Sequence, residues 1–315
     1  MTQNGNQARS TRFRSWLRIT GILITLVALA FFIQRIWSVG NSNWDTLLSP
    51  TVFLLVFFGG IAHGFNCLFQ GWAWQKLIVW FGESNASLKN CLVIYGRTQI
   101  AKYIPGNVFH FAGRHVAANQ AGFHHPALVG AMVYEIIGLL TVGAIISLLG
   151  FPGGLKLGSS LVLRLVFLPL LILLPLMVQF VLVRFSIARR LGIPEKPIWS
   201  GYKELIPVWG LYFIFFFVDG LIVWALISGY AGVWNSMPLL YIISGYAISW
   251  VIGFITPGAP AGLGVRDAVM ILFFSQFLGS TSATQITIIS RLVVTLGDLV
   301  FFLLTYFINR RSDSA

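Results

Sequence analysis

The sequence predicts an all-α, polytopic helical membrane protein with about six full spans and two helices broken at Pro-Gly, arranged as an inverted repeat. Of the 315 residues, 57% are hydrophobic and only 10% are charged, and the mean hydropathy is +0.82. These values exclude an ordinary soluble domain. The apolar runs are long, whereas the strands of a membrane barrel would give short alternating segments. The third observation is a Pro-Gly break that occurs twice.

The N-terminal region predicts a tail followed by an anchor. Residues 1–18 are polar and basic, and we expect them to form a cytoplasmic tail. The apolar run 19–39 is interpreted as the first span. A cleaved signal peptide is the alternative, because 28–30 reads Ala-Leu-Ala, but the run continues beyond that triplet and favours an uncleaved anchor. A second span follows at about 51–80.

The remaining apolar runs predict helices that cross the membrane or dip into it. In order, they are a first broken element at about 88–121, spans at about 126–149, 161–183 and 205–230, a second broken element at about 238–278, and a last span at about 285–308. We therefore expect a single membrane domain over 19–308, with halves at about 19–183 and 205–308 and a cytoplasmic tail at 309–315.

The two broken elements share one pattern. Pro105-Gly106 and Pro257-Gly258 stand 152 positions apart, and each is followed by seven residues and then an arginine, Arg114 or Arg266. Proline disfavours helix in the residue before it, and glycine permits a sharp turn. A new helix should then start with free N–H groups at its positive end, which favours an anion. Paired breaks of this kind mark binding sites in transporters.

Charge distribution predicts how the chain crosses the membrane. Basic residues concentrate in the N-terminal tail, in the loop 184–203 and at Arg310-Arg311. We place the N-terminal tail in the cytoplasm and let each broken element enter and leave the membrane on the same side. All three basic clusters then lie on the cytoplasmic side, as the positive-inside rule requires. Three full spans then separate the two broken elements. They should therefore start from opposite faces and meet near the midplane.

Several ionisable residues interrupt the apolar segments, where an unpaired charge costs at least about 2.5 kcal/mol. Arg291 and Asp298 share one face of the last span but are too far apart to pair with each other. Asp267 is a candidate partner for Arg291, and Arg114 or Lys102 for Asp298. The alternative is that these charges form structural ion pairs only. The full set is Arg97, Lys102, Arg114, Glu135, Asp219, Arg266, Asp267, Arg291 and Asp298.

Two stretches resemble the lysylphosphatidylglycerol synthase transmembrane-region family. They are 101–108 with Gly113-Arg114 and the later Glu135, and 256–267 with the later Arg291. The resemblance covers essentially the whole chain. The family includes the lipid-flipping part of multiple peptide resistance factors, and stand-alone proteins associated with polysaccharide, glycolipid or hopanoid synthesis. It implies a lipid translocator, or a relative of one, in a bacterial or archaeal cytoplasmic membrane. The basic clusters predict that both termini are cytoplasmic.

The chain departs from that family in two ways. Ala261 interrupts a glycine pair, and Asp267 replaces a glutamate, which keeps the charge but shortens its reach. The printed chain ends at Ala315 with no soluble synthase domain, so we expect no aminoacyl transfer and no enzymatic activity.

The leading hypothesis is a flippase-like carrier of an anionic lipid, either a phospholipid or a polyprenyl-phosphate-linked lipid. The excess of basic residues among the buried charges and the two helix starts suit a phosphate. Glu135, Asp267, Arg291 and Asp298 are expected to gate the site or balance its charge. The residues expected to bind the lipid phosphate are Arg114, Arg266, Pro105, Gly106, Pro257, Gly258 and Lys102.

Two other function classes remain open. One is a membrane glycosyltransferase that uses a polyprenyl-phosphate sugar, although the predicted outside loops offer only Asp45 as a carboxylate. The other is a non-transporting partner of an envelope synthase. No cofactor, catalytic residue or nucleic-acid partner is expected. The sequence leaves open a homo-oligomer and association with an envelope-synthesis enzyme. The two cysteines and the four histidines at 110, 115, 124 and 125 do not predict a metal site.

Overall fold

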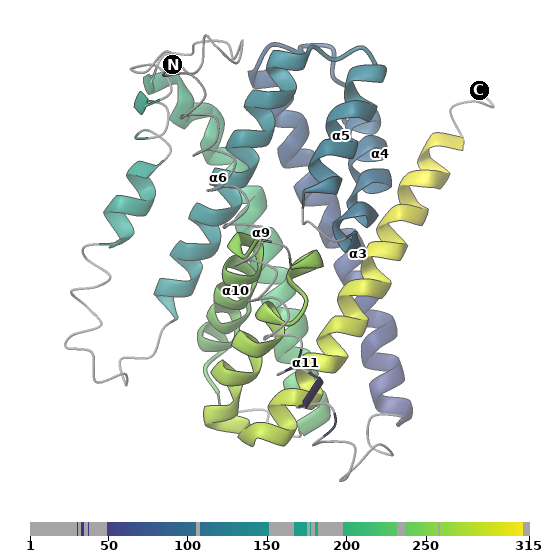
Figure 1. The fold of residues 1–315 in the computed structure, drawn as a ribbon, viewed down its shortest axis with the longest axis vertical. Coiled ribbons are helices and arrows are strands. Elements are labelled where there is room, and N and C mark those ends of the chain that lie inside the picture. Colours follow the sequence, from purple (N-terminus) through teal and green to yellow (C-terminus); the bar gives the residue numbers. More distant parts are fainter. Residues whose placement is uncertain are drawn as a thin grey trace, which may run out of the picture.

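The fold is described from a computed structural model, which describes residues 49–104, 108–150, 198–231, 237–257 and 259–310, with scattered positions between 30 and 37 and between 167 and 181. Within these ranges the chain is helical and has no strand (Figure 1). Four of the described helices are long and apolar enough to cross a membrane. The predicted all-α membrane architecture is therefore confirmed. The predicted tail 1–18 and most of the spans 19–39 and 161–183 lie outside the described residues. Of the predicted tail 309–315, residues 309 and 310 belong to the last helix, and the rest lies outside the described residues.

The first described span is α3 (Pro50–Trp80). Ser49 caps it, because its side chain accepts a hydrogen bond from the Val52 N–H at 3.4 Å. The helix has 31 residues and rises about 46 Å, enough to cross a bilayer with some tilt. Its glycines let α11 (Val265–Arg310) approach closely, since a Cβ at Gly64 would lie 2.6 Å from the Val300 side chain.

The first broken element consists of α4 (Leu88–Gln99), the 3₁₀ turn η1 (Ile100–Tyr103) and α5 (Phe109–Gln120). Its outer limits agree with the predicted 88–121. Ile104 is extended, with φ −74° and ψ 134°, as expected for the residue before a proline. The residues of the break itself, 105–107, lie outside the described residues.

Two long helices connect the broken elements to the rest of the bundle. α6 (His125–Leu149) agrees with the predicted span and has Pro126 in its first turn, where a missing N–H is harmless. α9 (Ile198–Ala231) begins seven residues before the predicted span 205–230. The last part of the predicted basic loop 184–203 is therefore helical, which corrects the loop boundary.

The second broken element consists of α10 (Leu239–Ile255), the 3₁₀ turn η2 (Pro260–Gly262) and the first part of α11. The prediction of a separate last span at 285–308 was wrong at its start. Gly279, with φ 74° and ψ 162°, is the one non-helical residue inside α11, so the chain turns at a single glycine and the last helix resumes directly after it.

The two broken elements start from opposite ends of the bundle (Figure 1). The short connections 81–87 and 121–124 place the start of α4 and the end of α5 at the end of the molecule where α6 begins. The start of α10 lies at the other end of α6, because the Ser244 hydroxyl donates to the Ile146 carbonyl at 2.7 Å. The two 3₁₀ turns, η1 and η2, contact each other in the middle. The predicted inverted arrangement is therefore observed in the described helices.

Candidate functional site

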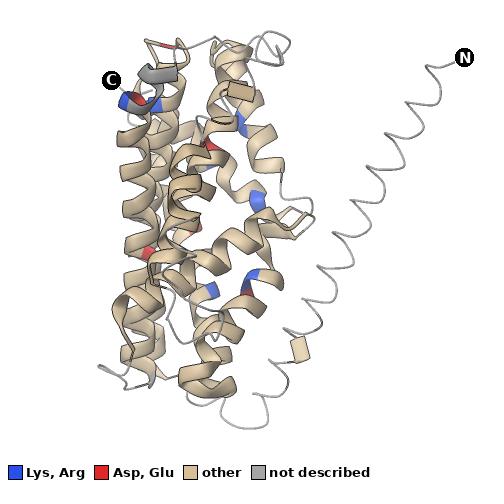
Figure 2. Cartoon of the chain, turned by 90° about the vertical axis from the view of Figure 1, so that its left-hand side faces the viewer, with Lys and Arg blue, Asp and Glu red and all other residues tan. Residues whose placement is uncertain are grey.

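A cavity lies where the two broken elements meet. It contains about 720 Å³ of empty space, including the part that opens outward, and every described span and both 3₁₀ turns contribute to its wall. Figure 2 shows charged residues in the middle of the bundle, away from both ends. The lining residues that carry a charge or a titratable group are His63, Cys67, Tyr95, Lys102, His110, Glu135, Tyr246, Arg266 and Arg291.

Arg266 is the buried arginine of this cavity whose charge is not met by a carboxylate. It is the second residue of α11 and is 8% exposed. Its guanidinium carbon lies 4.8 Å from the centroid of the Tyr246 ring, a cation–π contact. Among the described residues, no carboxylate lies within ion-pair distance of it. Gly253 is necessary beside it, because a Cβ there would come within 2.8 Å of the Arg266 Cβ.

Arg114, the counterpart in the first broken element, has a different environment. One of its terminal nitrogens donates to both oxygens of Glu135, at 2.6 and 2.7 Å, and both side chains are almost fully buried. Its guanidinium also covers the Tyr95 ring at 3.5 Å, and the Tyr95 hydroxyl donates to Glu135 at 2.8 Å. Glu135 reaches the cavity surface, whereas Arg114 is not among the lining residues. The two arginines are therefore not equivalent in this conformation.

Lys102 and Asp298 join the first break to the last helix. The Lys102 ammonium donates to one oxygen of Asp298 at 2.8 Å, and the Tyr103 hydroxyl donates to the other at 2.5 Å. Asp298 is 2% exposed, so its charge requires these donors. Of the two partners that the sequence left open for Asp298, the structure has Lys102 and not Arg114.

Arg291 and Asp267 hold the second break in shape. Their side chains form an ion pair, as predicted, and Asp267 also accepts the Gly264 N–H at 2.9 Å, which caps the start of α11. The other guanidinium nitrogens of Arg291 donate to the carbonyls of Ala261 and Gly262, each at 3.1 Å. Ala261 has φ 49°, a left-handed conformation that costs a non-glycine residue about 1 kcal/mol. Arg291 thus stabilises the turn where alanine replaces the expected glycine.

Asp219 has partners that sequence reasoning missed. His63 Nδ1 lies 2.7 Å from its Oδ1, which also accepts from the Asn66 amide at 2.9 Å. The Tyr246 hydroxyl donates to its other oxygen at 2.5 Å. Tyr246 thereby connects Asp219 to Arg266: its hydroxyl contacts the carboxylate, and its ring contacts the guanidinium. A recognisable signal existed, because polar residues recur along α3 at three- and four-residue spacing, at His63, Asn66, Cys67 and Gln70.

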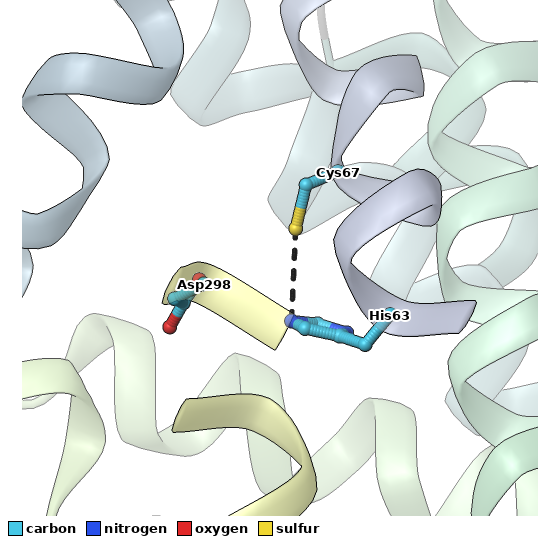
Figure 3. Close-up of side chains that lie close together, drawn as sticks. All are labelled: His63, Cys67 and Asp298. Carbon is cyan, nitrogen blue, oxygen red and sulfur yellow. Dashed lines mark hydrogen bonds between the residues drawn. The ribbon is translucent and has the colours of Figure 1, made fainter. Parts of the chain in front are cut away.

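Three side chains in this region have the donor types of a metal site (Figure 3). Ligand atoms of His63, Cys67 and Asp298 lie within 4.8 Å of one another. However, both oxygens of Asp298 already accept hydrogen bonds from Lys102 and Tyr103, so a cation would have to compete with a buried ammonium. The trio therefore does not fit a metal ion as arranged. His63 and Cys67 interact with each other, with 3.6 Å between His63 Nε2 and Cys67 Sγ.

The other histidines and the break residues complete the predicted positions. His115 and His125 form a hydrogen bond of 2.7 Å near the surface, and His124 pairs with Glu83 at 2.8 Å. His110 faces the cavity. Pro257 is exposed in a turn, whereas Pro105, Gly106 and Gly258 lie outside the described residues. The phosphate-binding and gating roles given to these residues from the sequence remain predictions.

Comparison with known proteins adds no functional assignment. No family model matches the chain, and neither a curated protein nor a solved structure does. The geometry of the cavity is therefore the observation from which function is inferred.

Proposed function

We propose that this chain is a membrane carrier that translocates an anionic lipid, with Arg266 binding the phosphate of its head group. The observation that carries the proposal is the buried Arg266 guanidinium, which faces the central cavity without a carboxylate partner in the described residues. A desolvated arginine binds phosphate strongly, because its planar fork donates two hydrogen bonds to the oxygens. A carrier of this kind is a transporter and not an enzyme.

The composition of the cavity wall supports an amphipathic substrate. Aromatic side chains stand beside the cations, and a lipid offers a charged head next to apolar carbon. The aromatic lining residues without a titratable group are Phe111, Phe215, Trp250 and Phe254. A phospholipid and a polyprenyl-phosphate-linked lipid share this chemistry.

The inverted arrangement supports alternating access. Two broken helices that start from opposite faces and meet at a cavity can open it to one side at a time. In the conformation described, Arg266 is available and Arg114 is held by Glu135. The proposal assigns Arg114 to the phosphate in the opposite state, where Glu135 would release it. The proposed location is a bacterial or archaeal cytoplasmic membrane with both termini cytoplasmic, in support of envelope synthesis.

The first prediction is that Arg266→Gln abolishes lipid movement while the protein still inserts and folds. Arg266→Lys should restore part of the rate, because lysine keeps the charge but loses the two-pronged contact. The assay uses the full chain in vesicles that contain a fluorescent phosphatidylglycerol or a fluorescent polyprenyl phosphate, with quencher added outside. The two substrates distinguish the two lipid classes.

Arg97→Gln is the matched control, because Arg97 is an exposed arginine of α4 that does not line the cavity. It should move lipid at the wild-type rate. Wild-type vesicles that move neither lipid faster than protein-free vesicles, or an Arg266→Gln variant with the wild-type rate, would contradict the proposal.

A further inference from the structure

His63 lies between two carboxylates in the middle of the membrane-spanning bundle. It is 3% exposed, and its Nδ1 is 2.7 Å from Asp219. Its Nε2 faces Cys67, and the carboxylate of Asp298 lies within 4.8 Å in the same cluster (Figure 3). His63 also lines the central cavity, so water and protons can reach it from there. Histidine is the side chain whose unperturbed charge change lies nearest neutral pH.

The elements around His63 bring a defined set of ionisable groups to the same region. α3 itself contributes Cys67, and α9 contributes Asp219. Tyr95 comes from α4, Lys102 and Tyr103 from η1, His110 and Arg114 from α5, Glu135 from α6 and Tyr246 from α10, while α11 contributes Arg266, Asp267, Arg291 and Asp298.

Ion pairing leaves one cation and one anion of this set without a direct partner that is permanently of opposite charge. Three pairs are closed: Arg114–Glu135, Lys102–Asp298 and Arg291–Asp267. Arg266 and Asp219 remain, and Tyr246 connects them by a ring contact on one side and a 2.5 Å hydrogen bond on the other. With a neutral His63, Asp219 balances Arg266 through Tyr246. With a protonated His63, Asp219 is balanced by the imidazolium and the charge of Arg266 is left over.

With His110 neutral, as no described carboxylate pairs with it, only two combinations of His63 protonation and bound anion keep this buried site electrically neutral. The first has a neutral His63 and no bound anion, and the second has a protonated His63 and one negative charge at Arg266. The mixed combinations leave a net charge in a poorly solvated interior, which is costly. Electroneutrality therefore links protonation of His63 to anion binding at Arg266.

We propose that His63 is the proton-binding site of the carrier and that each singly charged anionic head group binds at Arg266 together with one proton on His63. This inference rests on the proposed function and adds that lipid transport is coupled to proton movement. The proton adds to Nε2 of His63, the ring nitrogen that faces Cys67, from water in the cavity, and it leaves to water when the anion departs. The proton gradient across the membrane then drives net lipid movement.

The test measures protons taken up on binding by the purified full chain in detergent. Dioctanoyl phosphatidylglycerol is the phosphodiester probe, and farnesyl phosphate is the polyprenyl probe. Titration calorimetry in two buffers with different ionisation enthalpies gives the protons bound per probe. The wild type should take up about one proton with the phosphodiester, and its affinity should fall about tenfold per pH unit on the alkaline side of the histidine titration. For farnesyl phosphate, which titrates itself, the difference between wild type and His63→Gln gives the uptake.

His63→Gln should bind the probe with an affinity that does not change with pH and with no proton uptake. His125→Gln, which changes an exposed histidine outside the cavity, should behave as the wild type. If His63→Gln does not fold, the wild-type proton count alone decides. Binding of a probe to the wild type without proton uptake, or undiminished uptake in a folded His63→Gln variant, overturns the coupling and leaves the proposed function standing. Failure of both probes to bind the wild type at any pH contradicts the proposed function itself.

Discussion

Arg114 and Arg266 occupy the same place after their Pro-Gly breaks, but their chemical environments differ. Glu135 on α6 forms an ion pair with Arg114, whereas Arg266 is connected to Asp219 only through Tyr246, whose ring contacts the guanidinium and whose hydroxyl donates to the carboxylate. Tyrosine thus takes the place of a direct salt bridge in the second half. This single difference leaves one arginine neutralised and the other available for a ligand.

The Arg114–Glu135 ion pair should stabilise the folded protein, whereas Arg266 has no carboxylate partner whose loss would be felt in the same way. Glu135→Gln or Arg114→Gln alone leaves a buried charge without its partner and should lower the free energy of unfolding by about 3–5 kcal/mol. The double variant should recover most of that loss, because no unpaired charge remains. Unfolding in increasing SDS, followed by tryptophan fluorescence, gives the four free energies. Single variants as stable as the wild type would show that the pair is not structural.

The sequence predicts which residues are chemically unusual, but only in part how they pair. Charged residues in apolar helices are conspicuous, and Asp267 was a predicted candidate partner for Arg291, with which it pairs. His63 was missed, because one histidine in an apolar helix is unremarkable until α9 brings Asp219 beside it, 156 positions away. The choice of Lys102 over Arg114 for Asp298 depends on the path of η1, which spacing does not determine.

At the scale of elements, glycines decide how closely the helices approach. α3 packs against the last part of α11 through Gly60 and Gly64, and a Cβ at Gly64 would also lie 2.9 Å from the Gly297 carbonyl oxygen. This contact places His63, which lies between the two glycines, next to Asp298. Close packing at small residues is a usual way for membrane helices to associate.

Gly64→Ala should destabilise the bundle by about 1–3 kcal/mol, because the added methyl group overlaps Val300 and a backbone oxygen that cannot move freely. Gly210→Ala on α9 is the control, since a Cβ there meets nothing within 4 Å and alanine favours helix. Thermal melting in detergent compares the two. Equal melting temperatures would mean that the α3–α11 contact is looser than described.

The boundaries of the helices were predictable from the sequence where a proline sets them. The prolines at 105, 126 and 257 correctly predicted the ends of η1 and α10 and the start of α6. Two boundaries were not predictable. Gly279 breaks the last helix at one residue, although the predicted elements left 279–284 between them. α9 starts early, inside a segment that its charges marked as a loop. Hydropathy alone does not separate a polar helix end from a loop.

At the scale of the whole molecule, two broken helices start from opposite ends and meet in the middle. The prediction of this arrangement used only the positive-inside rule and the number of spans between the breaks. It depends on the spans at 19–39 and 161–183, which lie mainly outside the described residues. Alternating access at the central cavity requires that the two elements enter from opposite membrane faces.

Sided cysteine labelling determines from which membrane face each broken element starts. Ser84 is exposed just before α4, and Ser280 is exposed at the turn after the second broken element. Each is changed to cysteine, one at a time, after the two buried native cysteines, Cys67 and Cys91, are replaced. In intact cells, a membrane-impermeant thiol reagent should label Ser280→Cys but not Ser84→Cys, which should react only after the membrane is opened. Labelling of both positions from the same side would contradict the inverted arrangement and the central site built on it.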